Sequence, residues 1–312
     1  MKLLDCVNGA KNVLIVGHVR PDGDCFGSGL AMKRILENRG ASVDFVVDSV
    51  LPEQYSFMKN FNDVNKIKLS SYDLAISVDC ADELRLGSYY TTFKNCKASI
   101  NIDHHATNTK FGKFNFVQDV SSTCEVIYYL LKEDNVFDDV IAENLYTGLS
   151  TDTGHFKHNN TTPKTFAMAG DLITYNFNPQ YIHDMLYRNN SIKRTKLLAK
   201  ALNNIRFYKD NRIAIITITS QMLKDCDCIM TDTEGIIDFG MGIGCVDVSV
   251  CMTQQAQHSY KVSFRSKNVN VAQSAQVFGG GGHVLAAGCV VNGYYEDCIS
   301  KILKSITDGM ED

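Results

Sequence analysis

The chain has 312 residues, of which 45% are hydrophobic and 21% charged, as is typical of a globular protein large enough for two domains with separate cores. Its net charge is −4, from 31 Lys and Arg against 35 Asp and Glu, which argues against the broad basic surface that binds long duplex DNA. Its apolar runs are much shorter than the ~20 residues that a membrane span requires, and no signal-peptide apolar region follows the first residues. We therefore expect a cytoplasmic protein that does not interact with membranes.

The cysteines do not form a disulfide pattern. There are 11 of them, an odd number at irregular spacing, and several, such as Cys245 and Cys251, lie in apolar stretches. We expect buried, reduced thiols. Cys226 and Cys228 lack a second pair of ligands at zinc-site spacing, so a structural zinc site is not expected.

The first half of the chain alternates short apolar segments with helical patterns. The expected strands cover residues 13–17, 43–47, 74–78 and 98–102, and the expected helices cover residues 28–38, 126–132 and 140–149. This alternation predicts an α/β domain built on a doubly wound, mainly parallel sheet.

The second half changes character. Residues 163–205 have helical periodicity, and further strands are expected at 212–219, 247–252 and 260–265, with a terminal helix at 295–306. We predict a first domain at 1–190, a helical linker at 191–208 and a smaller α+β domain at 209–312.

Four short segments rich in Asp and His follow apolar runs that we interpret as strands. They are His18-Val-Arg-Pro-Asp22-Gly-Asp24, Val78-Asp79, Asp103-His104-His105 and Thr151-Asp152-Thr153-Gly154. Loops at the carboxyl ends of parallel strands converge on one crevice. Asp22 and Asp24 are two residues apart, so in an extended loop both face the same side. One site is therefore predicted from six side chains, namely His18, Asp22, Asp24, Asp79, His104 and Asp152.

Such a site makes electrostatic sense with metal ions. Four carboxylates in a small crevice repel one another, and two divalent cations neutralise them while leaving positions for water and phosphate. Oxygen and imidazole ligands without thiolate favour manganese or magnesium, with cobalt or zinc able to substitute, and we expect two Mn²⁺ ions. Taken singly, each residue has another interpretation, as a turn aspartate or a hydrogen-bonded core histidine.

The same segments carry a family resemblance. The stretches GHVRPDGDCFGSG, SVDCAD, IDHH and STDTG resemble the four motifs of the DHH phosphoesterase superfamily, and GGGGHVLAAG at 279–288 resembles the signature of its DHH-associated carboxyl-terminal domain. The resemblance covers nearly the whole chain. Length and layout resemble most the nanoRNase and pAp-phosphatase branch, which hydrolyses very short oligonucleotides and 3′-phosphoadenosine 5′-phosphate (pAp). It implies an active site in the cleft between the two domains.

The resemblance also implies roles for individual residues. One metal ion would be bound by His18, Asp22 and Asp79, and the second by Asp24, Asp79, His104 and Asp152, which makes Asp79 the bridging ligand. Asp103 would orient a histidine, and His105 would act on the substrate phosphate or the departing oxygen. The reaction would be hydrolysis by water that the two metal ions activate.

A second group of candidate residues lies in the carboxyl-terminal part. Consecutive glycines adopt backbone conformations closed to other residues, so their N–H groups can converge on a phosphate. Arg265 ends a predicted strand, where its guanidinium could hold a phosphate in bidentate fashion. The other interpretation is a flexible hinge and a solvated strand end. The expected substrate-binding residues are Arg265, Gly280, Gly281, Gly282 and His283.

The sequence therefore predicts a manganese-dependent phosphodiesterase or phosphatase whose substrate is a short oligonucleotide or a phosphorylated nucleotide. Hydrolysis of linear or cyclic dinucleotides, of pyrophosphate or of polyphosphate is the nearest alternative, although the cluster of basic residues of a pyrophosphatase is not found. A non-catalytic nucleotide-binding regulatory module is disfavoured by the intact ligand set. A homodimer is compatible with the sequence, since two-domain enzymes of this kind commonly pair.

Overall fold

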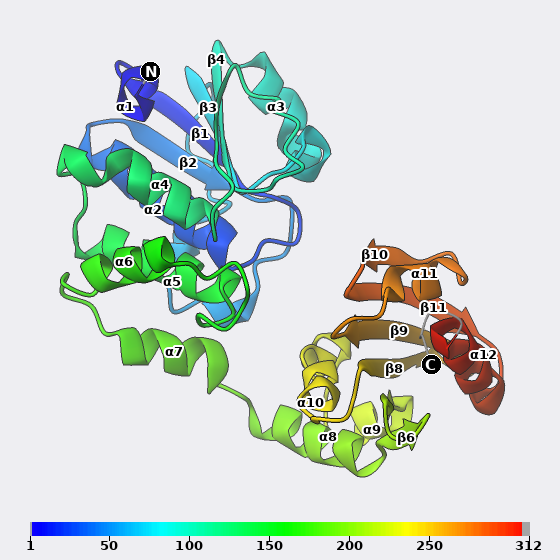
Figure 1. Cartoon of the computed structure of the whole chain (residues 1–312). Coiled ribbons are helices and arrows are strands. Elements are labelled where there is room, and N and C mark those ends of the chain that lie inside the picture. Colours follow the sequence, from blue (N-terminus) through cyan, green and yellow to red (C-terminus); the bar gives the residue numbers. More distant parts are fainter. Residues whose placement is uncertain (1, 308–312) are drawn as a thin grey trace. The chain divides into compact units, whose positions relative to one another are not determined.

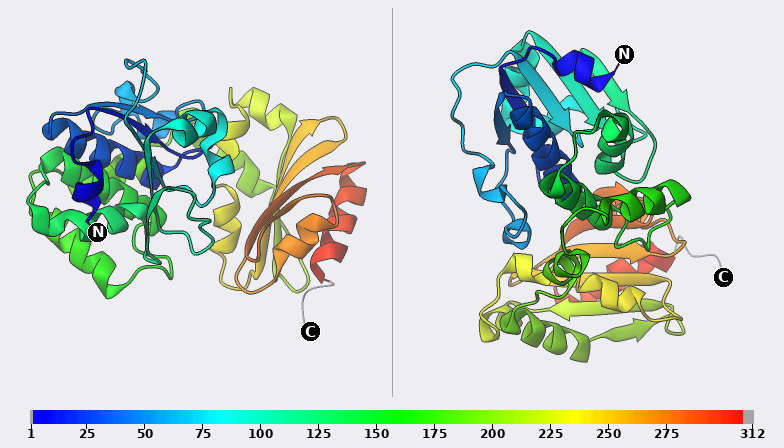
Figure 2. Two further views of the ribbon diagram at one scale, coloured as in Figure 1. Left: turned by 90° about the horizontal axis from the view of Figure 1, so that it is seen from above. Right: turned by 90° about the vertical axis from the view of Figure 1, so that its left-hand side faces the viewer.

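The computed structural model describes residues 2–307, which form two compact units, the first ending at Asn189 and the second beginning at Asn190 (Figure 1). Figure 2 shows each unit from two further sides. Segment 191–208, expected to be a linker, contains one helix and one short strand, and both belong to the second unit.

The first unit is built on a five-stranded sheet in which all neighbouring strands are parallel, in the order β2-β1-β3-β4-β5. Its strands are β1 (Asn12–Val16), β2 (Ser42–Val46), β3 (Leu74–Val78), β4 (Ala98–Asp103) and β5 (Phe114–Val117). The predicted parallel α/β architecture is confirmed. The edge strand β5 was not predicted, because its four residues are only half-buried, whereas the inner strands are almost entirely buried and mainly apolar.

Helices and short 3₁₀ segments cover both faces of this sheet. They are α1 (Leu3–Val7), α2 (Gly23–Asn38), η1 (Glu53–Tyr55), η2 (Phe61–Asp63), η3 (Glu83–Tyr89), α3 (Tyr90–Asn95), α4 (Thr123–Leu131), η4 (Lys132–Asp134), α5 (Asp139–Asp152), α6 (Pro163–Leu172) and α7 (Pro179–Tyr187). Alternate strand residues pack into different clusters: Val13 and Ile15 lie with α2, α4 and α5, whereas Leu14 and Val16 lie with η3 and α3. This two-sided burial explains why the inner strands carry apolar residues on both faces.

The strand order creates a topological switch point at the carboxyl ends of β1 and β3. From β1 the chain crosses to β2 on one side, and then returns to place β3 on the other side. The loops after β1 and β3 therefore diverge at a topological switch point, where ligands bind in open α/β sheets. Two of the four Asp- and His-rich segments follow these two strands.

The second unit holds a six-stranded mixed sheet in the order β10-β11-β9-β8-β7-β6, where only β7 and β8 pair in parallel. Its elements are α8 (Ile192–Asn203), β6 (Arg206–Tyr208), β7 (Ile213–Ile218), α9 (Ser220–Asp225), η5 (Met230–Thr233), α10 (Ile237–Met241), β8 (Val248–Ala256), β9 (Ser259–Ser266), α11 (Val271–Gln276), β10 (Gly281–His283), β11 (Ala286–Asn292) and α12 (Tyr295–Thr307). The predicted α+β character of this part is confirmed.

The two faces of this second sheet differ. Val262 and Phe264 of β9 point into a core closed by α11 and α12. On the other face, α8, α9 and α10 pack over β7 and β8. Farther along that face, Lys261 and Arg265 of β9 and Val290 of β11 are exposed. This part of the sheet presents polar and basic groups to solvent.

All 11 cysteines are free. Nine are buried, Cys6 is half-buried and Cys245 is exposed. The expectation that Cys245 is buried is wrong, because the residue lies in the turn between α10 and β8 and not within a strand. The thiol of Cys251, in β8, is buried as expected.

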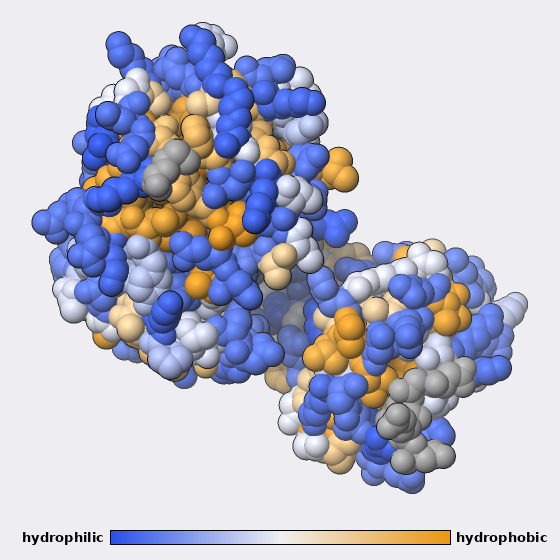
Figure 3. Space-filling model, turned by 45° about the horizontal axis from the view of Figure 1, so that its top comes forward, coloured by the Kyte–Doolittle hydropathy of each residue, from blue (hydrophilic) through white to orange (hydrophobic). Residues whose placement is uncertain are grey.

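In the view of Figure 3 hydrophilic residues cover most of the visible face, and apolar residues form a broad area and several smaller patches among them. Between residues 2 and 307, no helix has both the length and the apolar character needed to cross a bilayer.

Candidate metal centre

The loop after β1 supplies His18 and Asp22. His18 is 3% exposed, and its Nε2 lies 3.7 Å from Asp22 Oδ1. Asp22 is the N-cap of α2, because its Oδ1 accepts the backbone N–H groups of Asp24 and Cys25, both at 3.1 Å. The helix therefore begins at Gly23 and not near residue 28 as predicted.

This early helix start changes the geometry of Asp24. The residue lies in the first turn of α2, so the expectation that Asp22 and Asp24 share an extended loop is wrong. Asp24 is fully buried, and its two carboxylate oxygens accept the backbone N–H groups of Thr123 at 2.6 Å and Cys124 at 2.9 Å. Those amides open α4, and the helix dipole favours negative charge there.

Asp79 follows β3 directly and lies between two histidines. Its Oδ2 is 3.2 Å from Nε2 of His18, and its Oδ1 is 3.6 Å from Nε2 of His104. Thr123 Oγ1 also donates to Asp79 Oδ1 at 3.0 Å. The backbone of Asp79 is left-handed, with φ 60°, a conformation that costs energy and that concentrates at functional sites. Asp79 thus lies between His18 and His104, with one carboxylate oxygen toward each.

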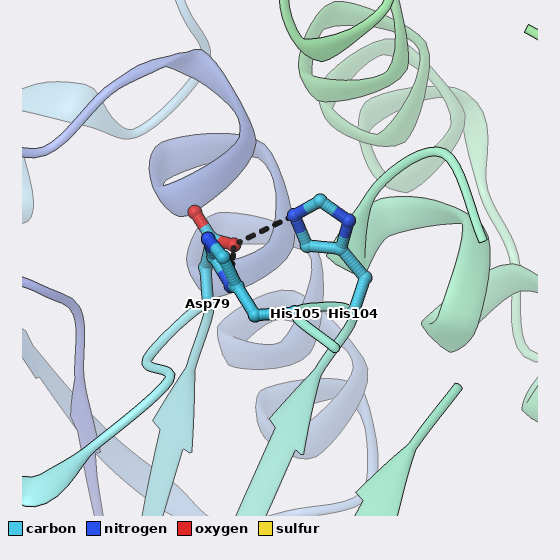
Figure 4. A group of neighbouring side chains, drawn as sticks. All are labelled: Asp79, His104 and His105. Atoms are coloured by element: carbon cyan, nitrogen blue, oxygen red, sulfur yellow. Dashed lines mark ion pairs between the residues drawn. The ribbon is translucent and has the colours of Figure 1, made fainter. Parts of the chain in front are cut away.

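His104 and His105 follow the last residue of β4, Asp103 (Figure 4). Nδ1 of His104 lies 3.1 Å from the backbone oxygen of Val120, so this nitrogen is engaged and Nε2 is the one that faces Asp79. Nδ1 of His105 lies 2.8 Å from Asp103 Oδ1 and 3.8 Å from Asp79 Oδ1. Both imidazoles are therefore oriented by hydrogen bonds on one nitrogen.

Asp103 is fully buried beneath the two histidines. Burial alone would raise its pKa, but the hydrogen bonds from His105 and from Asn108 Nδ2, the latter 2.6 Å long, lower it. Asn108 Nδ2 also lies within hydrogen-bond distance of the backbone oxygen of Cys80 and of Oδ1 of Asn101. Asp103 is thus a carboxylate held by a polar network and directed at His105.

Asp152 is the last residue of α5, so the interpretation of residues 151–154 as a loop after a strand is wrong. Its Oδ2 lies 3.5 Å from Nε2 of His104. The close packing of α5 depends on Gly148, where a Cβ would lie 2.3 Å from Cys124 Sγ and 3.0 Å from Asp24 Oδ1. A glycine here lets the end of α5 approach Asp24.

The structure brings all six predicted ligands together, and His105 with them. Their donor atoms form three overlapping groups within 4.8 Å, namely His18–Asp22–Asp79, Asp24–His104–Asp152 and Asp79–His104–His105. Asp79 and His104 each belong to two groups. This is the arrangement that two neighbouring cations with a shared carboxylate require.

The protonation equilibria of the cluster fit cation binding. Burial, and then the neighbouring carboxylates, raise the pKa of Asp152 to about 7 and also raise that of Asp24. Burial would lower the pKa of His18, but the carboxylates of Asp22 and Asp79 outweigh it and raise this pKa to about 10. For His104 the surrounding carboxylates outweigh burial in the same way and raise its pKa to about 9. The cluster without metal therefore favours the protonated forms of these four side chains, which reduces its negative charge. Its oxygen and imidazole donors suit divalent cations, which would reduce this charge in the same way.

Comparison with known proteins assigns the family. The model of the DHH family, N-terminal domain, matches residues 12–149, and the DHHA1 domain model matches residues 227–312. The bifunctional oligoribonuclease and PAP phosphatase NrnA of Thermus thermophilus is 30% identical over 95% of this chain and 89% of its own length. The chain belongs to the DHH family. The resemblance inferred from its motifs is confirmed.

Other DHH family relatives agree. The probable bifunctional oligoribonuclease and PAP phosphatase NrnA of Streptococcus mutans is 29% identical over 88% of each chain. Among solved structures, an exopolyphosphatase-related protein from Bacteroides fragilis superposes with a TM-score of 0.89 at 25% identity, covering 97% of this chain and 94% of that one. The DHH fold is thus matched across both units.

The DHHA1 part of the chain contains the other predicted residues. Arg265 is exposed on β9, where its Nη1 donates to the backbone oxygen of Phe264 at 3.0 Å. It lines a depression of about 330 Å³ together with Lys261 and Ser263 of the same strand and Thr253 of β8. In the antiparallel pairing of β9 with β11, Arg265 lies opposite Ala286.

The glycine run is more ordered than predicted. The N–H groups of Gly279 and Gly280 donate to the backbone oxygens of Gln276 and Ala275 and close the end of α11. These two amides are engaged within the chain, so the expectation of four consecutive N–H groups directed at one phosphate is wrong. Gly281, Gly282 and His283 form β10, and all three are exposed.

The sequence analysis did not predict several contacts of the site. Thr123 holds both Asp24 and Asp79, Asn108 holds Asp103, and Arg85 lies 2.8 Å from Nδ1 of His18. The available signal for Thr123 was the sequence Ser121-Ser122-Thr123 with Glu125, which resembles a helix start just before the predicted helix at 126–132, because helix N-terminal amides bind anions. For Arg85 there was none, since 67 residues separate it from His18.

Proposed function

We propose that this protein is a divalent-metal-dependent phosphoesterase that hydrolyses short oligoribonucleotides and pAp. The observation that carries the proposal is the position of Asp79, with one carboxylate oxygen on the side of His18 and the other on the side of His104. The printed names of its DHH family relatives, bifunctional oligoribonuclease and PAP phosphatase, support the substrate class.

In this proposal six side chains hold two cations, with Mn²⁺ as the preferred ion. His18, Asp22 and Asp79 would hold one, and Asp24, Asp79, His104 and Asp152 the other. Such cations, when bound, activate the attacking water and neutralise charge on the phosphoryl oxygens. The amides of Thr123 and Cys124 keep Asp24 in place, which pre-organises the second group.

His105 would supply the proton chemistry. Asp103 holds a proton on Nδ1 of His105 through their 2.8 Å hydrogen bond, which leaves Nε2 to face the substrate. From this position His105 would polarise the phosphate or protonate the departing sugar oxygen. Asp103 is fully buried and the hydrogen bonds that it accepts lower its pKa, so its carboxylate can hold the ring of His105 in this orientation.

We assign substrate binding to the second unit. Arg265, on an exposed polar part of the sheet, would hold a phosphate, and β10 with Gly281, Gly282 and His283 would contact the same end of the substrate. The N–H group of Gly280 closes α11, so we limit its role to shaping the turn before β10.

Initial rates test the proposal. Purified protein would be incubated with Mn²⁺, Mg²⁺ or Co²⁺ and, in parallel, with pAp, a dinucleotide, a five-nucleotide RNA, a fifty-nucleotide RNA and pyrophosphate. We expect turnover of pAp and the shorter RNAs, and the highest rates with Mn²⁺. Activity on pyrophosphate alone would refute the assigned substrate class, and equal rates on the two longer RNAs would refute the preference for short chains.

A further inference from the structure

Arg85 is placed beside the metal centre by its backbone. At the start of η3, Asp82 Oδ1 accepts the N–H groups of Leu84 at 2.9 Å and of Arg85 at 3.3 Å. On its other side, the carbonyl oxygen of Arg85 accepts the N–H group of Val19, next to His18, at 2.8 Å. These contacts fix the position of Arg85 without using its side chain.

The guanidinium of Arg85 has no anionic partner. Within residues 2–307, no carboxylate oxygen lies within 4.0 Å of it, and its Nε is buried without a hydrogen-bond acceptor. Among the described residues, its one side-chain hydrogen-bonding contact is between Nη2 and Nδ1 of His18, at 2.8 Å. A guanidinium has five N–H donors and no acceptor, so a buried donor without a partner is costly.

His18 is a poor partner for this donor. Its Nε2 faces Asp79 and Asp22, at 3.2 and 3.7 Å. Its Nδ1 also lies 2.9 Å from the backbone oxygen of Val19, so this one nitrogen is shared between that carbonyl and Arg85. A single ring nitrogen can satisfy at most one of the five N–H donors of the guanidinium. The arginine is thus held at the cluster with donors that the chain itself does not satisfy.

We infer that Arg85 is a substrate-binding residue whose guanidinium holds the non-bridging oxygens of the phosphate that is cleaved. The inference rests on the proposed function and adds to it a positive group from the chain. The fork of a guanidinium matches both carboxylate and phosphate oxygens, and the carboxylates of the cluster are not paired with Arg85, so a substrate phosphate is the acceptor that remains. Charge on these oxygens grows during the reaction, so the interaction stabilises the transition state.

The test compares Arg85→Met, Arg85→Lys and the control Arg39→Met, which alters an exposed arginine at the carboxyl end of α2. For Arg85→Met we expect kcat/KM for pAp to fall about 10²-fold, the size of effect seen when one preorganised donor is removed. Arg85→Lys should lie between this variant and the wild type. The control should match the wild type.

Two binding measurements separate this role from a structural one. Calorimetric titration with Mn²⁺ should give equal or tighter binding to Arg85→Met, because a positive charge beside His18 is removed. Titration of the Mn²⁺-loaded protein with inorganic phosphate should give weaker binding to Arg85→Met than to the wild type, whether or not pAp is turned over. Looser Mn²⁺ binding with kcat/KM restored at saturating Mn²⁺, or unchanged phosphate binding, would overturn the inference. If only the proposed function is wrong, the wild-type protein will bind inorganic phosphate more tightly than Arg85→Met but will not hydrolyse pAp.

Discussion

The two units differ in the burial and hydrogen bonding of their charged side chains. In the first, Asp24 and Asp103 are fully buried, and each carboxylate is satisfied by several donors from other elements. In the second, Arg265 is exposed on a strand and makes one short-range hydrogen bond to the neighbouring residue. A buried charge requires a matching set of partners, whereas an exposed one does not. We therefore expect the first unit to be intolerant of substitution and the second to respond in a graded way.

The largest expected effect is that of Asp79→Ala. Both cations would lose their shared ligand, so we expect turnover of pAp to fall at least about 10³-fold and Mn²⁺ binding to weaken. Steady-state kinetics and calorimetric titration measure the two effects. Glu133→Ala, at an exposed position of η4, is the control and should behave as the wild type. Near-normal rates for Asp79→Ala would contradict the assigned bridge.

Metal removal should destabilise the protein more at high pH than at low pH. In the metal-free chain the raised pKa values of His18 (about 10), His104 (about 9) and Asp152 (about 7) mean that the folded state binds protons more tightly than the unfolded state. This stabilisation is lost as pH rises toward those values. Bound Mn²⁺ replaces the protons, so the gain in melting temperature on adding Mn²⁺ to chelator-treated protein should grow from pH 6 to pH 9. Thermal scans check this, and a gain that shrinks with pH would contradict it.

Arg265→Ala should have a smaller effect. A phosphate contact away from the reacting centre stabilises the bound substrate and the transition state equally. Its loss should therefore raise KM for pAp about tenfold and leave kcat nearly unchanged. Lys301→Ala is the matched control, because α12 packs on the opposite face of the same sheet. An equal fall in kcat for Arg265→Ala would place this residue in the chemical step instead.

The smallest effect is expected at Asp138, which lies away from the cluster and caps α5. Its Oδ1 accepts the N–H group of Ile141 at 2.9 Å, and Arg34 Nε donates to its Oδ2 at 2.9 Å. Asp138→Ala should lower the free energy of unfolding by about 1 kcal/mol, while Asp138→Asn keeps most of the cap. Burial would raise the pKa of Asp138, but these hydrogen bonds lower it, so its stabilisation is present above the unfolded pKa and disappears as pH falls through the folded one. Urea unfolding measures the difference, and altered kinetics would contradict it.

The parallel sheet was predictable because its inner strands are buried on both faces. Val13–Val16 is apolar throughout and Leu74–Val78 is apolar except for the small residue Ser77, and the polar residues that follow them mark strand ends. That pattern led to the prediction that His18 and Asp79, at two such strand ends, belong to one site. The edge strand β5 lacks such a run and was missed.

The helical contributions to the site were harder to predict. Asp24 and Asp152 lie in the first and last turns of helices, and their separation of 128 positions gives no local sign of contact. Their proximity depends on how α5 packs beside Asp24 and Cys124, which Gly148 permits. Packing of this kind is set by the whole core and not by spacing in the sequence. The amide partners of Asp24 were hidden for the same reason.

The exposed thiol in the turn before β8 offers a practical route to spectroscopy. Nine of the other cysteines are enclosed, and Cys6 is half-enclosed, so a bulky maleimide dye should react first at Cys245. The native chain could then carry a fluorescent reporter in the DHHA1 part without prior mutagenesis. Anisotropy of that reporter would follow the arrival of a nucleotide at the second unit, independently of any bond being cleaved at the first.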